Sequence, residues 1–129
     1  MTYSLGNLKE LEDSAPKFGM PPGIEARFGR QALGCENLGF SYQRYAPGFR
    51  TFAHRHNVQE EVVVILSGGG RIKIEDDIHP LAQWDVVRIA PGTTRALEAG
   101  PEGVELLVFG APATPPGDAE ILEAWWSGD

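Results

Sequence analysis

The sequence predicts an all-β protein that consists of a single domain. About eight short segments have the composition of β-strands, and glycine- and proline-rich turn signals separate them about every 8–12 residues. Several segments alternate in polarity with a period of two, as strands with one buried face do. The length of 129 residues suits one domain with one hydrophobic core. We therefore expect a β-sandwich or a β-barrel.

The chain divides into an arm, a core and a tail. Residues 1–37 contain scattered prolines and are predicted to form an N-terminal arm, with a helical turn or two over 24–33. The core is predicted to span 38–110, and the tail 111–129 is predicted to contain a short helix over 118–126. The expected strands of the core are 38–46, 49–56, 60–67, 71–75, 78–82, 85–90, 95–99 and 104–110.

Composition and charge exclude several classes of partner. Eleven basic and eighteen acidic residues give a formal net charge of -7, and no basic cluster stands out, which argues against nucleic acid and anionic membranes as partners. No apolar run approaches the ~18 residues that a membrane-spanning helix needs, and the first residues do not resemble a signal peptide. The single cysteine, Cys35, cannot form an internal disulfide and suits a reducing cytoplasm.

One stretch, "HRHNVQEEVVVILSG", combines two imidazoles and a carboxylate with the most apolar part of the chain. On a strand, His54 and His56 point to the same side, and Glu61 reaches that side from an antiparallel neighbour together with Val63 and Ile65. Two histidines and one carboxylate form a known ligand set for iron, manganese, nickel, copper or zinc. Polar residues at the mouth of a barrel would show the same pattern, so both interpretations stay open.

The spacing around this stretch resembles the first motif of the cupins. That motif is a glycine, five residues, His-x-His, three or four residues, a glutamate, six residues and a glycine, which matches Gly48, His54, His56, Glu61 and Gly68. The segment 84–99 is similar to the second motif and keeps its aspartate, proline and glycine. The resemblance covers about residues 38–109 and implies a small jelly-roll barrel that commonly forms homodimers. Members of the family include dioxygenases, isomerases, epimerases, storage proteins and sensors.

The second motif departs from the family pattern at the position of the third histidine ligand. Arg95 stands there, three residues after Gly92. An arginine stays protonated and has no lone pair to offer a metal. Either Arg95 turns inward and pairs with Glu61, which leaves a metal-free pocket for an anionic molecule, or it lies beside a metal held by the triad and anchors an anionic substrate. The second motif also usually begins with a glycine, and Trp84 stands at that position in this chain.

The sequence therefore predicts a small-molecule-binding domain, with two functions in competition. In the first, His54, His56 and Glu61 hold a metal in an enzyme of dioxygenase or isomerase type. In the second, the domain is a metal-free, non-catalytic module whose Arg95 binds an anion. A third hypothesis is a structural protein with a relict pocket. Tyr42 and Phe52 are the further ligand-binding candidates, because their positions allow them to face the barrel interior. No catalytic residue is assigned.

The strand 60–67 is apolar on both sides, which predicts that its outer face is also covered. Val62, Val64 and Leu66 are expected to point away from the barrel interior. A contiguous apolar face is rare on the surface of a monomer. The arm, the C-terminal helix or a second subunit are the candidates for covering it, and a homodimer is expected.

Overall fold

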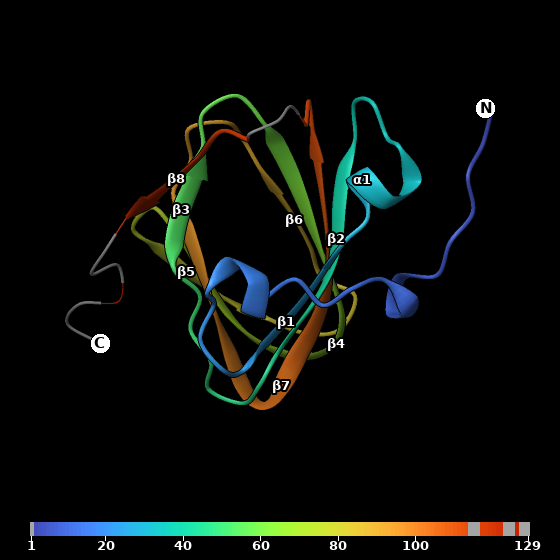
Figure 1. The fold of residues 1–129 in the computed structure, drawn as a ribbon. Helices are drawn as coiled ribbons and strands as arrows, with labels where there is room; N and C mark the ends of the chain where they lie inside the picture. Colours follow the sequence, from blue (N-terminus) through green and yellow to red (C-terminus); the bar gives the residue numbers. More distant parts are fainter. Residues whose placement is uncertain (1, 114–116, 123–125, 127–129) are drawn as a thin grey trace.

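The computed structural model, which describes residues 2–113, 117–122 and 126, is an antiparallel sheet curled into a barrel (Figure 1). The strand order is β1-β2-β7-β3-β8, and β4 pairs with β5, β6 and β7. The strands are β1 (Ile24–Phe28), β2 (Gly39–Tyr45), β3 (Ala53–His56), β4 (Glu60–Ile74), β5 (Asp77–Leu81), β6 (Val86–Ile89), β7 (Arg95–Ala111) and β8 (Ala119–Leu122). Two 3-10 turns, η1 (Leu8–Glu10) and η2 (Pro16–Phe18), and one helix, α1 (Arg30–Leu33), complete the described elements. The predicted all-β jelly-roll class is confirmed.

Two long strands, β4 and β7, each replace two predicted ones. They pair with each other antiparallel along almost their whole length, and the register shifts between Ile65 and Ser67 and between Gly68 and Gly70, where β4 bends. The bends contain glycines because the backbones approach too closely for a side chain. A Cβ atom on Gly70 would lie 2.0 Å from the carbonyl oxygen of Glu98. The glycines therefore bend β4 and shift its register without ending the strand. The same glycines led to the prediction of two separate strands, 60–67 and 71–75.

Both predicted helices differ from the structure. In the segment 24–33, Ile24–Phe28 forms strand β1 on β2, and only Arg30–Leu33 is helical. In the segment 118–126, Ala119–Leu122 forms strand β8 on β3, while 123–125 lies outside the described residues. Short segments of mixed polarity carry little information about periodicity, and the pairing with β2 and β3 decides their conformation.

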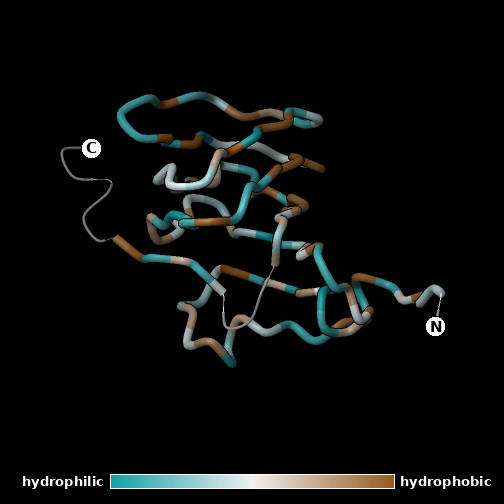
Figure 2. Tube along the Cα trace, turned by 90° about the horizontal axis from the view of Figure 1, so that it is seen from above, coloured by the Kyte–Doolittle hydropathy of each residue, from teal (hydrophilic) through white to brown (hydrophobic). Residues whose placement is uncertain are grey.

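The hydrophobic core lies inside the barrel. Apolar and polar residues alternate along many of the strands (Figure 2). On β4, Glu61, Val63 and Ile65 are buried, and Val62 and Val64 are only partly covered, as the alternation predicts. The buried cluster consists of Tyr45, Val63, Ile65, Ile72, Leu81, Ile89, Leu97, Ala99, Val104 and Leu106. None of the described helices is long and apolar enough to cross a membrane.

The N-terminal arm is tied to the outside of the barrel. Asp13 accepts hydrogen bonds from the backbone N–H groups of Ala15 and Ala26, at 3.1 and 2.9 Å, which fixes the arm to β1. The ammonium group of Lys9 donates to the hydroxyl of Tyr42 at 3.1 Å and lies 4.3 Å from the centre of its ring. The arm therefore covers part of the outer face of β2.

Candidate functional site

The structure brings His54, His56 and Glu61 together inside the barrel. The two histidines share one face of β3, and Glu61 stands at the start of β4. One potential ligand atom from each residue lies within 4.8 Å of the others. The two imidazole rings are 5.1 Å apart and nearly perpendicular. The three residues that are predicted from the sequence to be metal ligands thus form one cluster.

Arg95 enters the same cluster from the start of β7, opposite His54 in the strand register. Its guanidinium group donates to one carboxylate oxygen of Glu61 and, at 3.1 Å, to the carbonyl oxygen of Thr93. Arg95 is only 4% exposed and Glu61 only 9%, so water screens this ion pair weakly. The structure thus has the arrangement in which Arg95 turns inward and pairs with Glu61.

Asp118, which was not among the candidates predicted from the sequence, is the fifth polar residue of the cluster. It immediately precedes β8, which lies beside β3 (Figure 1). Its Oδ1 atom lies 2.8 Å from Nδ1 of His56. Its Oδ2 atom accepts the backbone N–H groups of Val58 and Gln59, at 2.6 and 2.9 Å. Asp118 therefore joins the C-terminal segment to His56 and to the loop after β3.

His56 and Glu61 face each other in an arrangement that requires a cation. The Nε2 atom of His56 lies 3.0 Å from Oε2 of Glu61. The carboxylate of Asp118 faces Nδ1 of the same ring at 2.8 Å, and a neutral imidazole has a hydrogen on only one of its two nitrogens, so the other nitrogen directs its lone pair at a carboxylate. Two acceptors would then point at each other. Either an added proton on His56 or a metal ion between the two atoms resolves the conflict.

The surroundings of the two histidines push their pKa values in opposite directions. Burial, with a contribution from the charge of Arg95, lowers the pKa of His54 from 6.5 to about 4. Burial also opposes a charge on His56, but its hydrogen bonds with Glu61 and Asp118 outweigh this and raise its pKa. His54 is therefore neutral at neutral pH, with a lone pair available, whereas a proton competes with any metal for His56.

The two carboxylates of the cluster are held in their ionised form. Burial opposes the charge of Glu61, but the hydrogen bond with His56 and the charge of Arg95 lower its pKa overall. Burial also opposes the charge of Asp118. The backbone N–H of Val58 and the imidazole of His56 outweigh burial and lower the pKa of Asp118 to about 2. Both groups are thus anionic across the neutral range.

Tyr42 and Phe52, the other two candidates, are not brought to the triad. Tyr42 lies on the outer face of β2, where its hydroxyl donates to Glu105 and accepts from Lys9. Phe52 precedes β3 and is 62% exposed. The residues of β2 that alternate with Tyr42, namely Ser41, Gln43 and Tyr45, face the interior instead. There the Tyr45 hydroxyl donates to the side-chain oxygen of Gln43 at 2.5 Å, and the Gln43 amide donates to the Ser41 hydroxyl at 3.0 Å.

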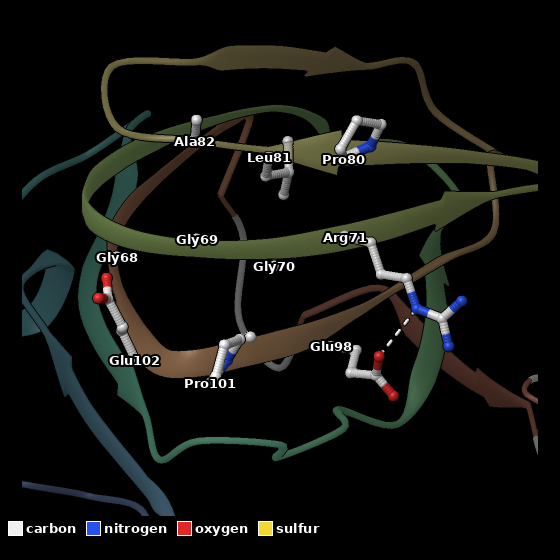
Figure 3. A pocket seen from close by; sticks show the side chains of 11 residues that line it. Gly68, Gly69, Gly70, Arg71, Pro80, Leu81, Ala82, Glu98, Pro101 and Glu102 are labelled. Carbon is white, nitrogen blue, oxygen red and sulfur yellow. Dashed lines mark hydrogen bonds and ion pairs between the residues drawn. The ribbon is translucent and has the colours of Figure 1, made fainter.

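A separate cavity of about 530 Å³ lies at the bends of β4 and β7 (Figure 3). Backbone and small side chains form most of its wall, and Arg71 donates to Glu98 at its edge at 2.8 Å. Its lining residues are Gly68, Gly69, Gly70, Arg71, Pro80, Leu81, Ala82, Glu98, Gly100, Pro101 and Glu102. The lining includes no member of the triad, so this cavity is distinct from the His54–His56–Glu61 cluster.

Among known sequences, an uncharacterised protein of Methanocaldococcus jannaschii is 30% identical to the chain over 77 residues. The match covers 59% of this chain and 62% of that protein, so the chain spans less than two thirds of its relative's length. No family model matches the chain.

Solved structures resemble the whole barrel. Oxalate decarboxylase from Bacillus subtilis matches with a TM-score of 0.77 at 20% identity, over 98% of this chain and 35% of that one. A sugar phosphate isomerase of the cupin superfamily from Silicibacter pomeroyi matches with a TM-score of 0.74 at 19% identity, over 93% of this chain and 82% of that one. Together with the curled antiparallel sheet, these matches show that the chain has the fold of the cupin superfamily.

Proposed function

We propose that this chain is a small-molecule-binding cupin whose His54, His56 and Glu61 hold a divalent transition metal. The observation that carries the proposal is the opposition of Nε2 of His56 and Oε2 of Glu61 at 3.0 Å, with Nδ1 of His56 bonded to Asp118. A ligating histidine commonly donates its second ring N–H to a carboxylate in this way. Iron, manganese, nickel, copper and zinc all accept such ligands.

The donor set fits a metal with open coordination positions. His54 is neutral at neutral pH, and Glu61 is ionised, so each already has the protonation state that a metal requires. Arg95 occupies one oxygen of Glu61 and leaves Oε2 facing the histidines. A bound divalent ion would supply Lewis-acid polarisation of an oxygen on the small molecule. The chain's own residues would hold and orient that ion, and the charge of Arg95 would weaken its binding.

The small molecule is proposed to be anionic. A metal and Arg95 together place two positive centres in one barrel, with Glu61 shared between them, so a ligand carboxylate or phosphate would offset the excess charge. The names of the two structural neighbours fit this class, because oxalate and a sugar phosphate are both anions. If the chain is an enzyme, we propose a reaction of dioxygenase or isomerase type.

The Arg95–Glu61 ion pair favours a second candidate, a metal-free and non-catalytic module that binds an anion. With His56 protonated, the charges of Arg95, Glu61, His56 and Asp118 sum to zero without any metal. The buried cluster is then electrostatically complete. An anionic ligand of this module would interact with Arg95 by sharing its guanidinium group with Glu61.

We also propose that the chain forms a homodimer in the cytoplasm. On the outer face of the sheet, Val62, Val64 and Leu66 are only partly covered, and Val86 on β6 is 67% exposed. An isologous contact between two such faces would remove this apolar surface from water. A lone cysteine, Cys35, suits a reducing compartment.

Elemental analysis separates the two candidate functions. Protein purified without an affinity tag is expected to carry a substantial fraction of one transition metal per chain. His56→Ala should lower this content tenfold or more, since two remaining ligands hold a metal poorly. His79→Ala is the matched control, because His79 is exposed on β5 and outside the triad. If metal stays below a few per cent after reconstitution at neutral pH, the metal-free module replaces the first candidate.

A further inference from the structure

We propose that Ser41, Gln43 and Tyr45 bind oxygen atoms of the small molecule and so select ligands that carry hydroxyl or carbonyl groups besides their anionic group. We call these three side chains on the inner face of β2 the polar row. The inference rests on the proposed function, because it concerns the ligand of the same barrel interior. It depends neither on the protonation of the histidines nor on the identity of a metal.

The polar row has more hydrogen-bond donors than it uses. Tyr45 and Ser41 each have one O–H hydrogen, and the Gln43 amide has two N–H hydrogens, which makes four in all. Two of them are used within the row, at 2.5 Å between Tyr45 and Gln43 and at 3.0 Å between Gln43 and Ser41. Within the part of the chain that the structure describes, these side chains make no other hydrogen bond. Two donor hydrogens are thus left without an acceptor.

This count does not depend on how the Gln43 amide is oriented. In the structure, the Tyr45 hydroxyl donates to the amide oxygen and the amide nitrogen donates to Ser41, so the Ser41 hydroxyl hydrogen and one amide hydrogen remain. Turning the amide over reverses both bonds and leaves the hydrogen of Tyr45 in place of that of Ser41. In either orientation, one hydroxyl hydrogen and one amide hydrogen inside the barrel need an acceptor.

The two hydroxyl groups of the row are shielded from bulk water. Ser41 is 4% exposed and Tyr45 6%, whereas Gln43 between them is partly exposed. His54 and His56, which also face the interior, are partly exposed as well, so the interior can be reached from outside. A buried donor without an acceptor is costly. A ligand oxygen beside the row would therefore supply the acceptor that the fold lacks.

The strand register places the row within reach of the proposed site. Ser41 pairs with Val108 of β7, which in turn pairs with the residue two positions after Glu61 on β4. Two strand spacings and two residues along the strand thus separate Ser41 from Glu61, on the order of 12 Å between Cα atoms. Burial and the nearby charge of Glu61 raise the pKa of Tyr45, so its hydroxyl keeps its hydrogen. A small molecule can therefore place an anionic group near Arg95 and other oxygen atoms at the row.

Gluconate and hexanoate test this selectivity, because both are monocarboxylates of the same chain length and only gluconate carries hydroxyl groups. In calorimetric titrations, the wild-type chain is expected to bind gluconate about tenfold more tightly than hexanoate. Ser41→Ala and Gln43→Leu should each reduce this preference by roughly three- to tenfold, the effect of one neutral hydrogen bond. Tyr42→Phe is the matched control, because it removes a hydroxyl from the outer face of the same strand and should keep the preference.

A second measurement, made without any ligand, tests whether the row serves the fold instead. The combined variant Ser41→Ala/Gln43→Leu/Tyr45→Phe replaces the row with apolar groups of similar shape. Such a replacement removes the unsatisfied donors together with their partners. The urea midpoint of the combined variant should therefore equal or exceed that of the wild type.

The outcomes separate this inference from the proposed function. A wild-type chain that binds both probes equally overturns the inference alone, and so does a preference for gluconate that survives in both single variants. A combined variant that is clearly less stable than the wild type would mean that the row stabilises the fold, which also overturns the inference. A wild-type chain that binds neither probe contradicts the proposed anionic ligand, and the inference fails with it.

Discussion

The guanidinium group of Arg95, the first residue of β7, bonds the carboxylate of Glu61, the second residue of β4, inside the barrel. Both strands bend, and this brings their beginnings to the same end of the barrel as β3. The pair places a permanent positive charge at the position where the cupin motif that the sequence resembles has a third histidine. The stability of the barrel and the proposed affinity for a metal are therefore both expected to depend on these two residues.

Removal of Glu61 should destabilise the chain strongly. Glu61→Gln leaves Arg95 buried with no opposite charge, and breaking a buried pair in this way costs about 3–5 kcal/mol in the free energy of unfolding. Urea denaturation measures the change. The neighbouring Glu60→Gln is the control, because Glu60 pairs with Arg88 on the exposed surface and such pairs contribute less than about 1 kcal/mol. Equal effects of the two substitutions would contradict the proposed importance of the buried pair.

The triad was predictable because its three members lie within eight positions of the chain. His54 and His56 share a strand face by alternation alone, and only a short turn separates them from Glu61. Asp118 was not predictable, since its contact depends on the pairing of β8 with the adjacent strand β3, which is distant in the sequence. The segment that carries it looked helical in sequence, and no local pattern reveals that register.

The orientation of β2 shows a second limit of sequence patterns. Tyr42 and its parity mates are the more apolar set, so alternation favours them for the interior, but the structure places Ser41, Gln43 and Tyr45 there. The arm covers the outer face through Lys9, which buries Tyr42 on the outside. The inward polar side chains of Ser41, Gln43 and Tyr45 form hydrogen bonds with one another. When a segment distant in the sequence covers the outer face of a strand, apolar residues can therefore lie on that outer face and polar residues inside the barrel.

The bend of β4 should not tolerate a side chain at Gly70. In Gly70→Ala, the new Cβ atom would lie 2.0 Å from the carbonyl oxygen of Glu98, so one of the two strands must shift. Overpacking of this kind costs about 1–3 kcal/mol, and a backbone clash belongs at the upper end of that range. Gly6→Ala is the control, since its Cβ would meet only Leu33 at an ordinary 3.4 Å. Thermal and urea unfolding of both variants would test the argument, and equal stability would contradict it.

Acid should destabilise the barrel partly through His54. Its pKa is 6.5 in the unfolded chain and about 4 in the folded chain, so the unfolded state binds more protons between these values. Its contribution is present above pH 6.5 and is lost as the pH falls towards 4, on the order of 3 kcal/mol in total. His56 acts in the opposite direction, because its pKa is raised and its contribution is lost as the pH rises above 6.5.

The His54→Gln variant isolates this contribution. The difference in unfolding free energy between the wild type and His54→Gln should become smaller as the pH falls from 6.5 to 4.5, a window above the main titration of Glu61 and Asp118. His79→Gln, on the exposed face of β5, is the control for removing a histidine outside the barrel interior. Urea midpoints measured across this window give the comparison. A difference that does not vary with pH would mean that His54 is not protected from protonation.

The outer face of the sheet should mediate the proposed homodimer. Val86→Glu places a charge beside Val64, its partner in the strand register, and should shift the chain towards monomer. Ile78→Glu is the control, because Ile78 is an exposed apolar residue on β5 and lies outside this face. Sedimentation velocity at micromolar concentration measures both. A wild-type chain that sediments as a monomer would contradict the predicted contact.

Arg95→His should convert the site into a stronger metal centre. The substitution removes a buried positive charge next to the proposed metal position and adds an imidazole opposite His54 in the strand register. Affinity for nickel or zinc is expected to rise by about tenfold or more, roughly 1.4 kcal/mol, while affinity for an anionic ligand falls. Calorimetric titration of metal-free protein compares the variant with the wild type. Arg88→His, on the exposed side of β6, is the control for adding a histidine to the chain and should leave the affinity unchanged. Because Arg95 is buried against Glu61 rather than directed to solvent, equal or weaker binding by Arg95→His would mean that the ligand atoms of the triad do not converge on a metal.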